Sequence, residues 1–523
     1  MLFNSFGFIL GFLPVTAAVF FVLARFNHRL AAGWLTIASA FFYGWWNPAY
    51  VALLAISVSF NYAFGILIVR AVASGRTAES QRLLTLAVLA NLLLLGYYKY
   101  ANFFLGTANN IAGTHWSLGE IVLPLGISFF TFTQIAYLVD TYQGKVKEYS
   151  FVHYALFVTY FPHLIAGPVL HHKEMMPQFA QPETYRPTLK NFSVGLTIFS
   201  IGLFKKVILA DGIAVYASPI FTAAETGSPV TLFDAWGGVL AYSLQLYFDF
   251  SGYSDMAIGL SRVFGIVLPL NFNSPYKAVN VIEFWRRWHM TLSRFLRDYL
   301  YIALGGNRKG TARRYLNLGI TMFLGGLWHG AGWTFAAWGL LHGLYLVVNY
   351  TWQALRRALG HDLSRSTPFG RGIARSLTLL AVIAGWVFFR SSSFEAAVHL
   401  LDAMAGFRGI ALPEAIGRLL GPLHGTLSSA GVEFREGGGS QFALTYLWVG
   451  SLACIVLFAP NTQEILRRYR PGLDFYPARG GQASAIGMVT WRPSRWWGVA
   501  TGVVFACGML SLTRVSEFLY FQF

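Results

Sequence analysis

The sequence NFNSPYKAVNVIEFWRRWHMTLSRFLRDYLYIALGGNRKGTARRYLNLGITMFLGGLWHGAGWTFAAWGLLHGLYLVVNY, residues 271–350, decides the fold. A basic, aromatic segment with one histidine is followed directly by a long apolar segment with further histidines. Its first part, residues 284–301, has no Gly or Pro and spaces large apolar residues at helical intervals, so we expect one helix there. On that helix Trp285 and His289 would share a face, because residues four apart are neighbours.

The charges of this expected helix place it outside the lipid hydrocarbon. Each charged side chain at the membrane centre costs roughly 2.5 to 3.5 kcal/mol on insertion scales. The helix carries Arg286, Arg287, Arg294, Arg297 and Asp298. We therefore expect it to lie at the membrane interface or to line a wet cavity. A basic, glycine-containing loop at residues 305–314 follows, and we expect it to be cytoplasmic.

The second part, residues 316–349, is nearly uncharged and is too long for a single span of about 20 residues. Arginine pairs flank it on both sides, which indicates a hairpin that leaves the cytoplasmic side and returns to it. The middle of the segment reads GGLWHGAGWT. Its glycines, Gly325, Gly326, Gly330 and Gly332, indicate a close backbone approach or a break in the helix.

His329 lies among these glycines, at the expected depth of the membrane. A lone histidine on an apolar face is often a packed core residue. An ionisable residue at membrane depth is nevertheless a functional hypothesis by default, and irregular backbone is tolerated there where it lines a cavity. His342 would lie about 220° further round one continuous ideal helix, so we expect it to be structural.

Two segments, FWRRWHMTLSRFLRDYLYIALGG and GLWHGAGWTFAAWGLLHG, resemble the signature region of the membrane-bound O-acyltransferase family. The similarity is strongest to the bacterial branch that serves alginate O-acetylation, and it extends more distantly to D-alanylation of teichoic acid. Four further segments resemble the same branch: residues 123–142, 160–179, 247–266 and the terminal FLYFQF at 518–523. The resemblance thus covers most of the chain.

This resemblance implies an all-α polytopic membrane protein of about ten to twelve transmembrane or re-entrant helices. It implies a single membrane-embedded domain over residues 1–523, with a signature core at about 247–350. The histidine of the LWHG motif is catalytic in the family and corresponds to His329. The histidine of the WRRWH motif is a second functional position and corresponds to His289, although other branches carry asparagine near it.

The resemblance also implies the partners. The acyl donor is expected to be a cosubstrate on the cytoplasmic side, either acetyl-CoA or another acyl thioester, or an acyl carrier. No bound cofactor is expected. The acetyl group would reach an exopolysaccharide such as alginate or cellulose, directly or through periplasmic polysaccharide acetylation proteins. The expected location is the inner membrane of a bacterium.

Composition independently indicates a membrane protein. The chain is 55% hydrophobic and 12% charged, with a mean hydropathy of +0.51. The net charge of +17 does not indicate nucleic acid, because Lys and Arg lie between apolar segments rather than in one patch. We interpret them as topology signals and as contacts to anionic lipid or donor. Cys454 and Cys507 lie in apolar runs, so neither a disulfide nor a cysteine metal site is expected.

Apolar segments recur along the whole chain. The first 29 residues lack a basic leader, which indicates a retained first span with its N-terminus outside. The next segment, residues 30–69, is long enough for two spans broken at WWNP. Further spans or re-entrant pieces are expected at 83–98, 121–139, 151–170, 191–209, 232–266, 373–389, 442–458 and 496–512. Residues 406–440, rich in Gly, are expected outside the membrane.

Two other polar clusters need interpretation. His163, His171, His172 and Glu174 could suggest a metal, but their spacing fits no common helical ligand motif, so no metal site is predicted. The second cluster is FDFSGYSD at residues 248–255, which is either a surface turn or the lining of a cavity.

Acyl transfer from a thioester needs a base near neutrality, donors for the developing oxyanion and exclusion of water. Neutral histidine suits the first need, and the absence of a G-x-S-x-G motif argues against a covalent serine intermediate. We expect His329 to be the general base or a transient acyl carrier, assisted by His289. Candidates for donor binding are Arg286, Arg287, Arg294, Arg297, Trp285 and Trp328.

Two other classes of protein remain open at this point. A transporter of an acyl compound or polysaccharide could use His329 as a proton relay. Transporters often contain two related halves with paired broken helices, and no such repeat is visible here. The other alternative is a scaffold subunit that only anchors periplasmic enzymes.

Overall fold

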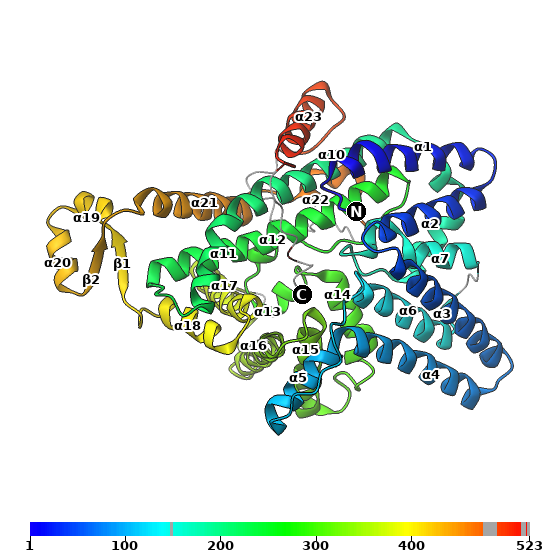
Figure 1. Cartoon of the computed structure of the whole chain (residues 1–523), viewed down its shortest axis with the longest axis horizontal. Helices are drawn as coiled ribbons and strands as arrows, with labels where there is room; N and C mark the ends of the chain where they lie inside the picture. Colours follow the sequence, from blue (N-terminus) through cyan, green and yellow to red (C-terminus); the bar gives the residue numbers. More distant parts are fainter. Residues whose placement is uncertain (147–149, 364, 474–488, 514–518, 520–523) are drawn as a thin grey trace.

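The fold is described from a computed structural model that covers residues 1–146, 150–363, 365–473, 489–513 and 519. Helices make up nearly all of the regular structure, as the sequence predicts (Figure 1). Within the described part of the chain, six helical segments are long and apolar enough to cross a membrane: Gly7–Ala24, Ala49–Ala73, Thr77–Ala112, Leu189–Glu225, Pro368–Arg390 and Gly439–Phe458. The chain is therefore a multi-pass membrane protein. The count of ten to twelve passages stays a prediction, as does the single domain.

The N-terminal helices follow the apolar segments of the sequence closely. These are α1 (Leu13–Ala24), α2 (His28–Gly44), α3 (Ala49–Ala73) and α4 (Thr77–Leu95), followed by the π-helix η2 (Gly96–Tyr100) and α5 (Ala101–Ala112). The predicted break at WWNP is confirmed, because α2 ends before it and Pro48 is the N-cap of α3. The loops that join α1 to α2 and α3 to α4 lie at the same end of the molecule (Figure 1).

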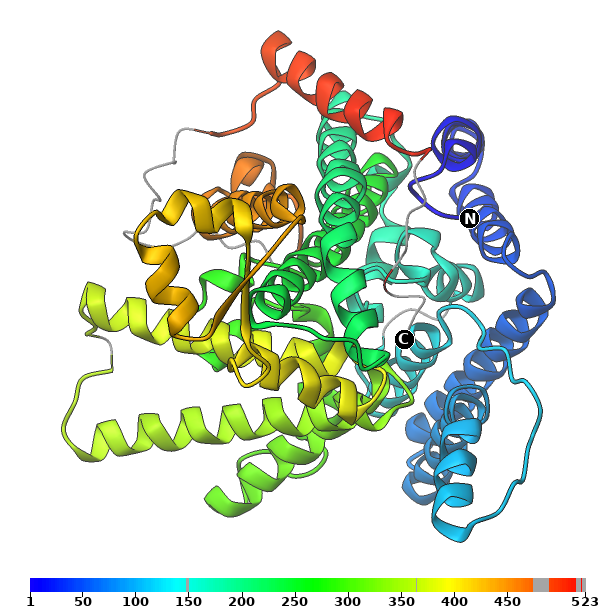
Figure 2. The same ribbon diagram turned by 60° about the vertical axis from the view of Figure 1, so that its left-hand side comes forward.

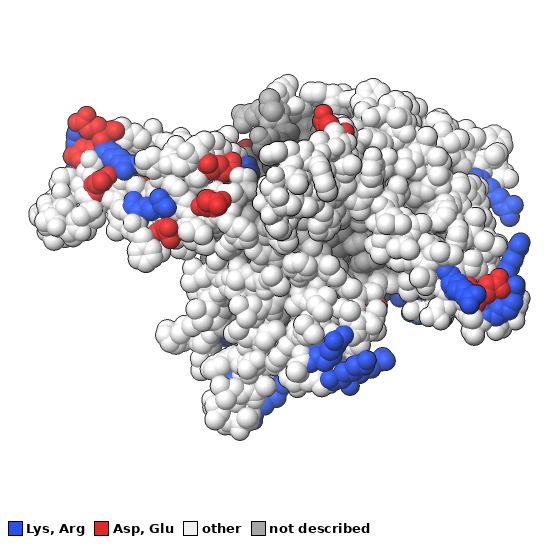
Figure 3. All heavy atoms as spheres, turned by 60° about the horizontal axis from the view of Figure 1, so that its bottom comes forward, with Lys and Arg blue, Asp and Glu red and all other residues white. Residues whose placement is uncertain are grey.

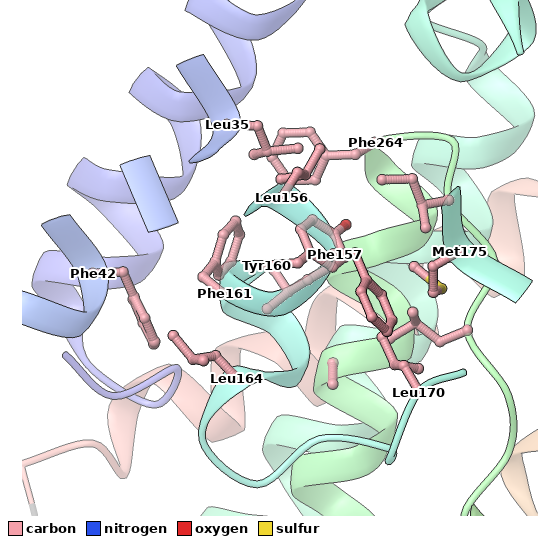
Figure 4. Packing of buried hydrophobic residues seen from close by; sticks show 14 of the residues in the cluster. Leu35, Phe42, Leu156, Phe157, Tyr160, Phe161, Leu164, Leu170, Met175 and Phe264 are labelled. Atoms are coloured by element: carbon pink, nitrogen blue, oxygen red, sulfur yellow. The ribbon is translucent and has the colours of Figure 1, made fainter. Parts of the chain in front are cut away.

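The next segment forms short pieces, as its prolines and glycines indicate. They are α6 (Ile127–Tyr142), α7 (Phe151–Thr159), α8 (Phe161–Leu164) and α9 (His172–Ala180). Figure 4 shows Phe161 and Leu164 of α8 facing Phe42 of α2, with Phe264 of the later chain close by. This aromatic packing holds the irregular backbone inside the protein, where such backbone is tolerated in a membrane.

The centre of the molecule is α12 (Leu232–Val263), which packs along α10 (Leu189–Phe204) and α11 (Asp211–Glu225). Glycines on α10 and α12 allow a close approach, since a Cβ built on Gly202 would lie 2.6 Å from the carbonyl oxygen of Gly252. The motif FDFSGYSD lies inside α12 and is buried. Its interpretation as a surface turn is therefore wrong. A turn was expected because its glycine and polar residues favour turns locally, whereas here they pack against neighbouring helices.

The C-terminal part comprises α15 (Gly310–His329), α16 (Trp333–Ala358), α17 (Pro368–Arg390), α18 (Phe394–Met404), α21 (Gly439–Phe458), α22 (Thr462–Ile465) and α23 (Arg495–Leu510). Figures 1 and 2 both show α15 and α16 side by side, in agreement with the predicted hairpin. The terminal motif at 518–523 lies outside the described residues apart from Leu519.

Residues 406–440 form a small unit of their own. It contains strands β1 (Ile410–Pro413) and β2 (Val432–Arg435), paired in parallel with Ile410 opposite Val432, and helices α19 (Glu414–Leu420) and α20 (Leu423–Ser429). The unit lies at the far end of the molecule from the α1–α2 and α3–α4 loops (Figure 1). Figure 3 shows charged side chains gathered in a few groups, with wide uncharged surface between them, which suits a protein surrounded by lipid.

Candidate active site

The expected helix at 284–301 is broken, and this correction changes the surroundings of His289. The structure has α13 (Val281–Trp285), α14 (Met290–Phe295) and the π-helix η6 (Leu296–Tyr301). Between α13 and α14 the chain turns, and His289 is the N-cap of α14 with a φ of 41°. Trp285 and His289 therefore do not share a helical face. The break has no local signal, because Gly and Pro are absent and every residue suits a helix.

Tertiary contacts hold His289 in this left-handed conformation, which a residue other than glycine rarely adopts and which costs about 1–3 kcal/mol. The backbone N–H of Met290 donates to the carbonyl oxygen of Asn271 at 2.9 Å. The Thr291 hydroxyl donates to Oδ1 of Asn271 at 2.6 Å. The His289 side chain is fully buried, with its ring edge-on to Phe250 at 4.7 Å. The backbone conformation at His289 is therefore stabilised by Asn271, which lies outside α14.

His329 is the last residue of α15, and the chain reverses through Gly330 and Gly332 into α16. Both predicted roles of the glycines are present. A Cβ on Gly326 would overlap the carbonyl oxygen of Phe335, so glycine allows α15 and α16 to touch. A Cβ on Gly330 would overlap the Phe335 ring, so glycine is also needed at the break.

The two histidines come together at this break. The ring centroids of His289 and His329 are 6.3 Å apart, with an angle of 61° between the ring planes. His329 is 8% exposed and its ring is edge-on to Trp338 at 5.2 Å. Trp328 completes the enclosure, 6.2 Å from His289. Two imidazoles in an aromatic, water-poor setting can accept and return a proton.

Lys99 and Tyr100 of η2 are residues that the sequence interpretation missed. The Lys99 ammonium donates to the carbonyl oxygens of Trp328 and His329, the latter at 3.2 Å. The Tyr100 hydroxyl donates to the carbonyl oxygen of Leu327 at 2.8 Å. These are terminal carbonyls of α15, which have no partner within the helix and carry partial negative charge. A lysine inside the apolar run LLLLGYYKYANFF was the available signal.

A small cavity of about 140 Å³ borders His329, Trp328 and Lys99. Its other walls come from the start of α6 and the segment before it, from Ile165 and from Trp46 of the α2–α3 loop. Trp46 is 61% exposed, so this wall reaches the protein surface.

A larger cavity of about 540 Å³ lies between α13, α14 and η6 on one side and α15 and α16 on the other. It is lined by four of the six donor-binding candidates: Trp285, Arg286, Arg294 and Arg297. Arg287 instead pairs with Glu283 at 2.7 Å, and Trp328 lines the smaller cavity. The candidates therefore divide between two cavities.

The arginines of the larger cavity differ in how far their charge is compensated. Arg294 makes a two-pronged ion pair with Glu174, at 2.7 and 2.8 Å. Arg297 pairs with Asp298 at 2.7 Å, although its side chain is 62% exposed. Arg286 is exposed and makes no ion pair with any residue that the structure describes. It is the charge most available to an anionic ligand.

His342 lies on α16 rather than on one continuous helix with His329, so the premise of the 220° argument is wrong. The helix ends at His329 because the glycines and the Lys99 contact terminate α15. His342 is fully buried, and its Nδ1 accepts a hydrogen bond from the Trp285 indole at 3.3 Å. The Trp338 ring lies between the two histidines, 5.2 Å from His329 and 5.0 Å from His342.

The histidines of the cluster between His163 and Glu174 have separate partners. His163 Nε2 is 2.8 Å from the carbonyl oxygen of Phe157, and His171 Nδ1 is 3.1 Å from the Tyr299 hydroxyl. Burial, reinforced by the Arg294 charge, lowers the pKa of His171 to about 3, so this residue is neutral near pH 7. Among the described residues, no group of three or more His, Cys, Asp or Glu is arranged to hold a metal.

The carboxylates of FDFSGYSD form buried ion pairs with two neighbouring lysines. Lys205 lies 2.7 Å from Asp255, and Lys206 lies 2.6 Å from both Asp249 and Asp211. Thr462 of α22 also donates to Asp255, at 2.6 Å. These pairs tie the π-helix η4 (Lys205–Ala210) to α12, so the motif stabilises the core that carries the site.

The structure is thus that of a helical membrane protein with a buried histidine pair beside a small cavity. A sequence model of MBOAT, the membrane-bound O-acyltransferase family, matches residues 41–384. The chain belongs to this family and is an O-acyltransferase. The predicted fold class and family are thereby confirmed.

Three relatives show the range of the similarity. The chain is 44% identical over 439 residues to a peptidoglycan O-acetyltransferase of Helicobacter pylori, covering 79% of this chain and 81% of the relative. It is 38% identical over 538 positions to the probable alginate O-acetylase AlgI of Pseudomonas putida, covering 100% of both. It is 28% identical over 253 residues to a teichoic acid D-alanyltransferase of Streptococcus thermophilus, covering 46% of this chain and 60% of the relative.

Proposed function

We propose that this enzyme O-acetylates a polysaccharide of the bacterial cell envelope, using an acetyl thioester from the cytoplasmic side. The relatives that support this carry names of alginate and peptidoglycan O-acetylation enzymes. Alginate is the acceptor that the sequence motifs favour, whereas the Helicobacter relative makes peptidoglycan the principal alternative. The location is the inner membrane, where both a cytoplasmic thioester and an external glycan are within reach.

The observation that carries the proposal is that the histidine pair lies beside a small cavity, while the residue that follows His289 lines a second, basic cavity. His329 lines the smaller cavity, and Met290, which follows His289, lines the larger one. In the expected topology, the Arg297 end of the larger cavity adjoins the cytoplasmic loop at 305–314. Trp46 of the smaller cavity belongs to a loop on the opposite side. We infer that the donor approaches the histidine pair from the larger cavity and the acceptor from the smaller one.

His329 acts in this proposal as the general base. It accepts the proton of the acceptor hydroxyl as that oxygen bonds to the acyl carbon, and the C–S bond of the thioester breaks. The proton then passes from His329 to the departing sulfur. If the acyl group first bonds to His329, the C–S bond breaks in that step and the ring N–H proton passes to the departing sulfur. The acceptor hydroxyl then attacks the acyl carbon, the bond from that carbon to the imidazole breaks, and the hydroxyl proton returns to the ring. His289 orients the reacting groups beside it.

The larger cavity would bind the donor. Its arginines suit the phosphates of acetyl-CoA or the acidic surface of an acyl carrier, because guanidinium groups bind phosphate and carboxylate with two parallel hydrogen bonds. Arg286 is the first contact we assign, since its charge is exposed and uncompensated within the described structure. Trp285, which also lines this cavity, would flank the thioester arm.

The smaller cavity would receive the acceptor. At about 140 Å³ it suits a single hydroxyl-bearing group better than a folded stretch of polysaccharide. This favours delivery through a periplasmic acetylation protein that inserts a hydroxyl side chain and later passes the acetyl group to the glycan.

Purified enzyme in vesicles, supplied with acetyl-CoA labelled in the acetyl group, tests the proposal. Labelled acetyl on an added glycan or on a partner protein, absent with His329→Gln, is the expected result. Passage of intact donor across the membrane would indicate the transporter instead. If neither transfer nor passage occurs even when the partner protein is present, the scaffold alternative is the better account.

A further inference from the structure

A third cavity, of about 490 Å³, lies away from the histidine pair and is unusually basic. It is formed where the start of α10 and the end of α12 meet the 3₁₀-helix η7 (Arg467–Tyr469) and the residues that follow it. Its lining contains Lys190, Arg262, Arg468 and Arg470, and no acidic residue lines it among those that the structure describes. Four positively charged side chains therefore line one cavity.

Within the described part of the chain, no carboxylate compensates these charges. Among the described residues none forms an ion pair with these four side chains. The Arg262 Nε atom is shielded from solvent and makes no hydrogen bond within the described structure. To the described residues, its guanidinium makes one long hydrogen bond, 3.5 Å from Nη2 to the carbonyl oxygen of Tyr469. Burying a charge without a partner is unfavourable, which argues for an anion in this cavity.

The cavity lies at the end of the molecule that we expect to face the cytoplasm. Tyr185, close before α10, stacks on His28 of the α1–α2 loop region at 4.3 Å. Phe264, directly after α12, meets Phe20 near the end of α1 at 5.3 Å. The basic pair beside α1, Arg25 and Arg29, predicts that this end is cytoplasmic.

Exposed apolar side chains lie on the elements that form the cavity. Leu189, next to Lys190, is 88% exposed, and Leu196 on α10 is 47% exposed. Leu473, which lines the cavity, is 40% exposed. A phospholipid could place its phosphate in the basic cavity and its acyl chains against the exposed apolar side chains. This arrangement suits recognition of an anionic lipid.

We propose that this cavity binds a phosphate group, with Arg262 and Arg470 as its main ligands. Guanidinium groups match phosphate in geometry and charge, and Lys190 adds a point charge. The phosphate belongs either to an anionic phospholipid of the cytoplasmic leaflet or to a soluble phosphate compound. The site is separate from the proposed donor cavity, because the two are lined by different elements.

The test measures ligands retained by the purified full-length enzyme. Native mass spectrometry would count phosphatidylglycerol and phosphatidylcholine bound to wild type and to Arg262→Gln/Arg470→Gln. Arg356→Gln/Arg357→Gln is the matched control, because it removes the same charge from the last turn of α16, which is also expected on the cytoplasmic side. Lys190→Gln/Arg468→Gln, which changes only exposed side chains, serves if the first variant fails to fold.

Selective retention of phosphatidylglycerol by wild type and control, with at least a tenfold loss in the cavity variant, would support a lipid headgroup. Inorganic phosphate or glycerol 3-phosphate is added in a second arm. Binding of these compounds without lipid retention, again lost in the cavity variant, would support a soluble phosphate source. Equal binding of all ligands by the cavity variant and its control would overturn the proposal.

Discussion

The ammonium group of Lys99 lies 3.2 Å from the carbonyl oxygen of His329, although 230 positions separate the two residues in the chain. This contact joins the N-terminal helices to the C-terminal end of α15. It compensates the negative end of that helix at the residue where the chain must reverse. The position of the His329 ring therefore depends on a residue from another part of the sequence.

Replacing Lys99 by Met should lower the rate of acyl transfer while leaving the donor KM nearly unchanged. A hydrogen bond to a charged group contributes about 1.5–3 kcal/mol, so we expect a loss of roughly 10- to 100-fold if the His329 position depends on it. Lys99→Arg should recover part of the rate. Lys309→Met, in an exposed loop, is the control, and equal activity of the two Met variants would show that Lys99 has no positioning role.

His329→Gln should abolish acyl transfer without reducing membrane insertion, because the replacement leaves no unpaired charge. General acid and base catalysis contributes on the order of 10²- to 10⁴-fold. Loss with His289→Ala should be smaller, and with His342→Ala smaller still, since His342 contacts Trp285 and not the cavity beside His329. Initial rates with labelled donor measure this order. Retention of more than about a tenth of the activity by folded His329→Gln would make His329 a packing residue.

Arg286→Gln should raise the donor KM, and the effect should weaken as salt is added, because exposed charges are screened over about 8 Å at physiological ionic strength. Arg287→Gln is the comparison, since Arg287 is already paired with Glu283. Steady-state kinetics at several salt concentrations distinguish the two variants. A lower yield of folded protein with unchanged donor dependence would indicate that Arg286 anchors the protein to lipid headgroups.

Gly339→Ala should destabilise the hairpin, because a Cβ there would overlap the carbonyl oxygen of Met322 in α15. Forced overlap in a packed interior costs typically about 1–3 kcal/mol. Gly319→Ala on α15 is the matched control, since its Cβ would meet nothing within 4 Å. Thermal unfolding in detergent compares them, and equal midpoints would show that the close approach is not needed.

Four connections should all be cytoplasmic: the one beside Arg25 and Arg29, the one between Arg70 and Arg82, the one around Arg308 to Arg314 and the one after Arg356 and Arg357. Single cysteines introduced there should resist a membrane-impermeant thiol reagent in intact cells. Native Cys454 and Cys507 are exposed in the structure and must first be replaced by Ala or Ser. Labelling of the 308–314 loop would invert the hairpin and place the donor cavity on the wrong side.

The sequence by itself determined the class of the protein, most of its helices and the two histidines that lie together. Long apolar runs specify membrane helices because unpaired backbone groups are costly in lipid, and this effect is local in the chain. The glycines around His329 were also informative in the sequence, because a glycine such as Gly326 allows α15 and α16 to approach closely.

Tertiary structure alone decided the break at His289, the division of the donor candidates between two cavities and the role of Lys99. The pattern of residues 284–301 predicts one helix. In the structure the backbone N–H of Met290 instead donates to the carbonyl oxygen of Asn271, and the chain turns at His289. Ion pairs such as Arg294 with Glu174 decide which charges remain available, and they join residues 120 positions apart. Local periodicity and helix propensity cannot predict such contacts, because the contacts form only when distant segments of the chain pack together.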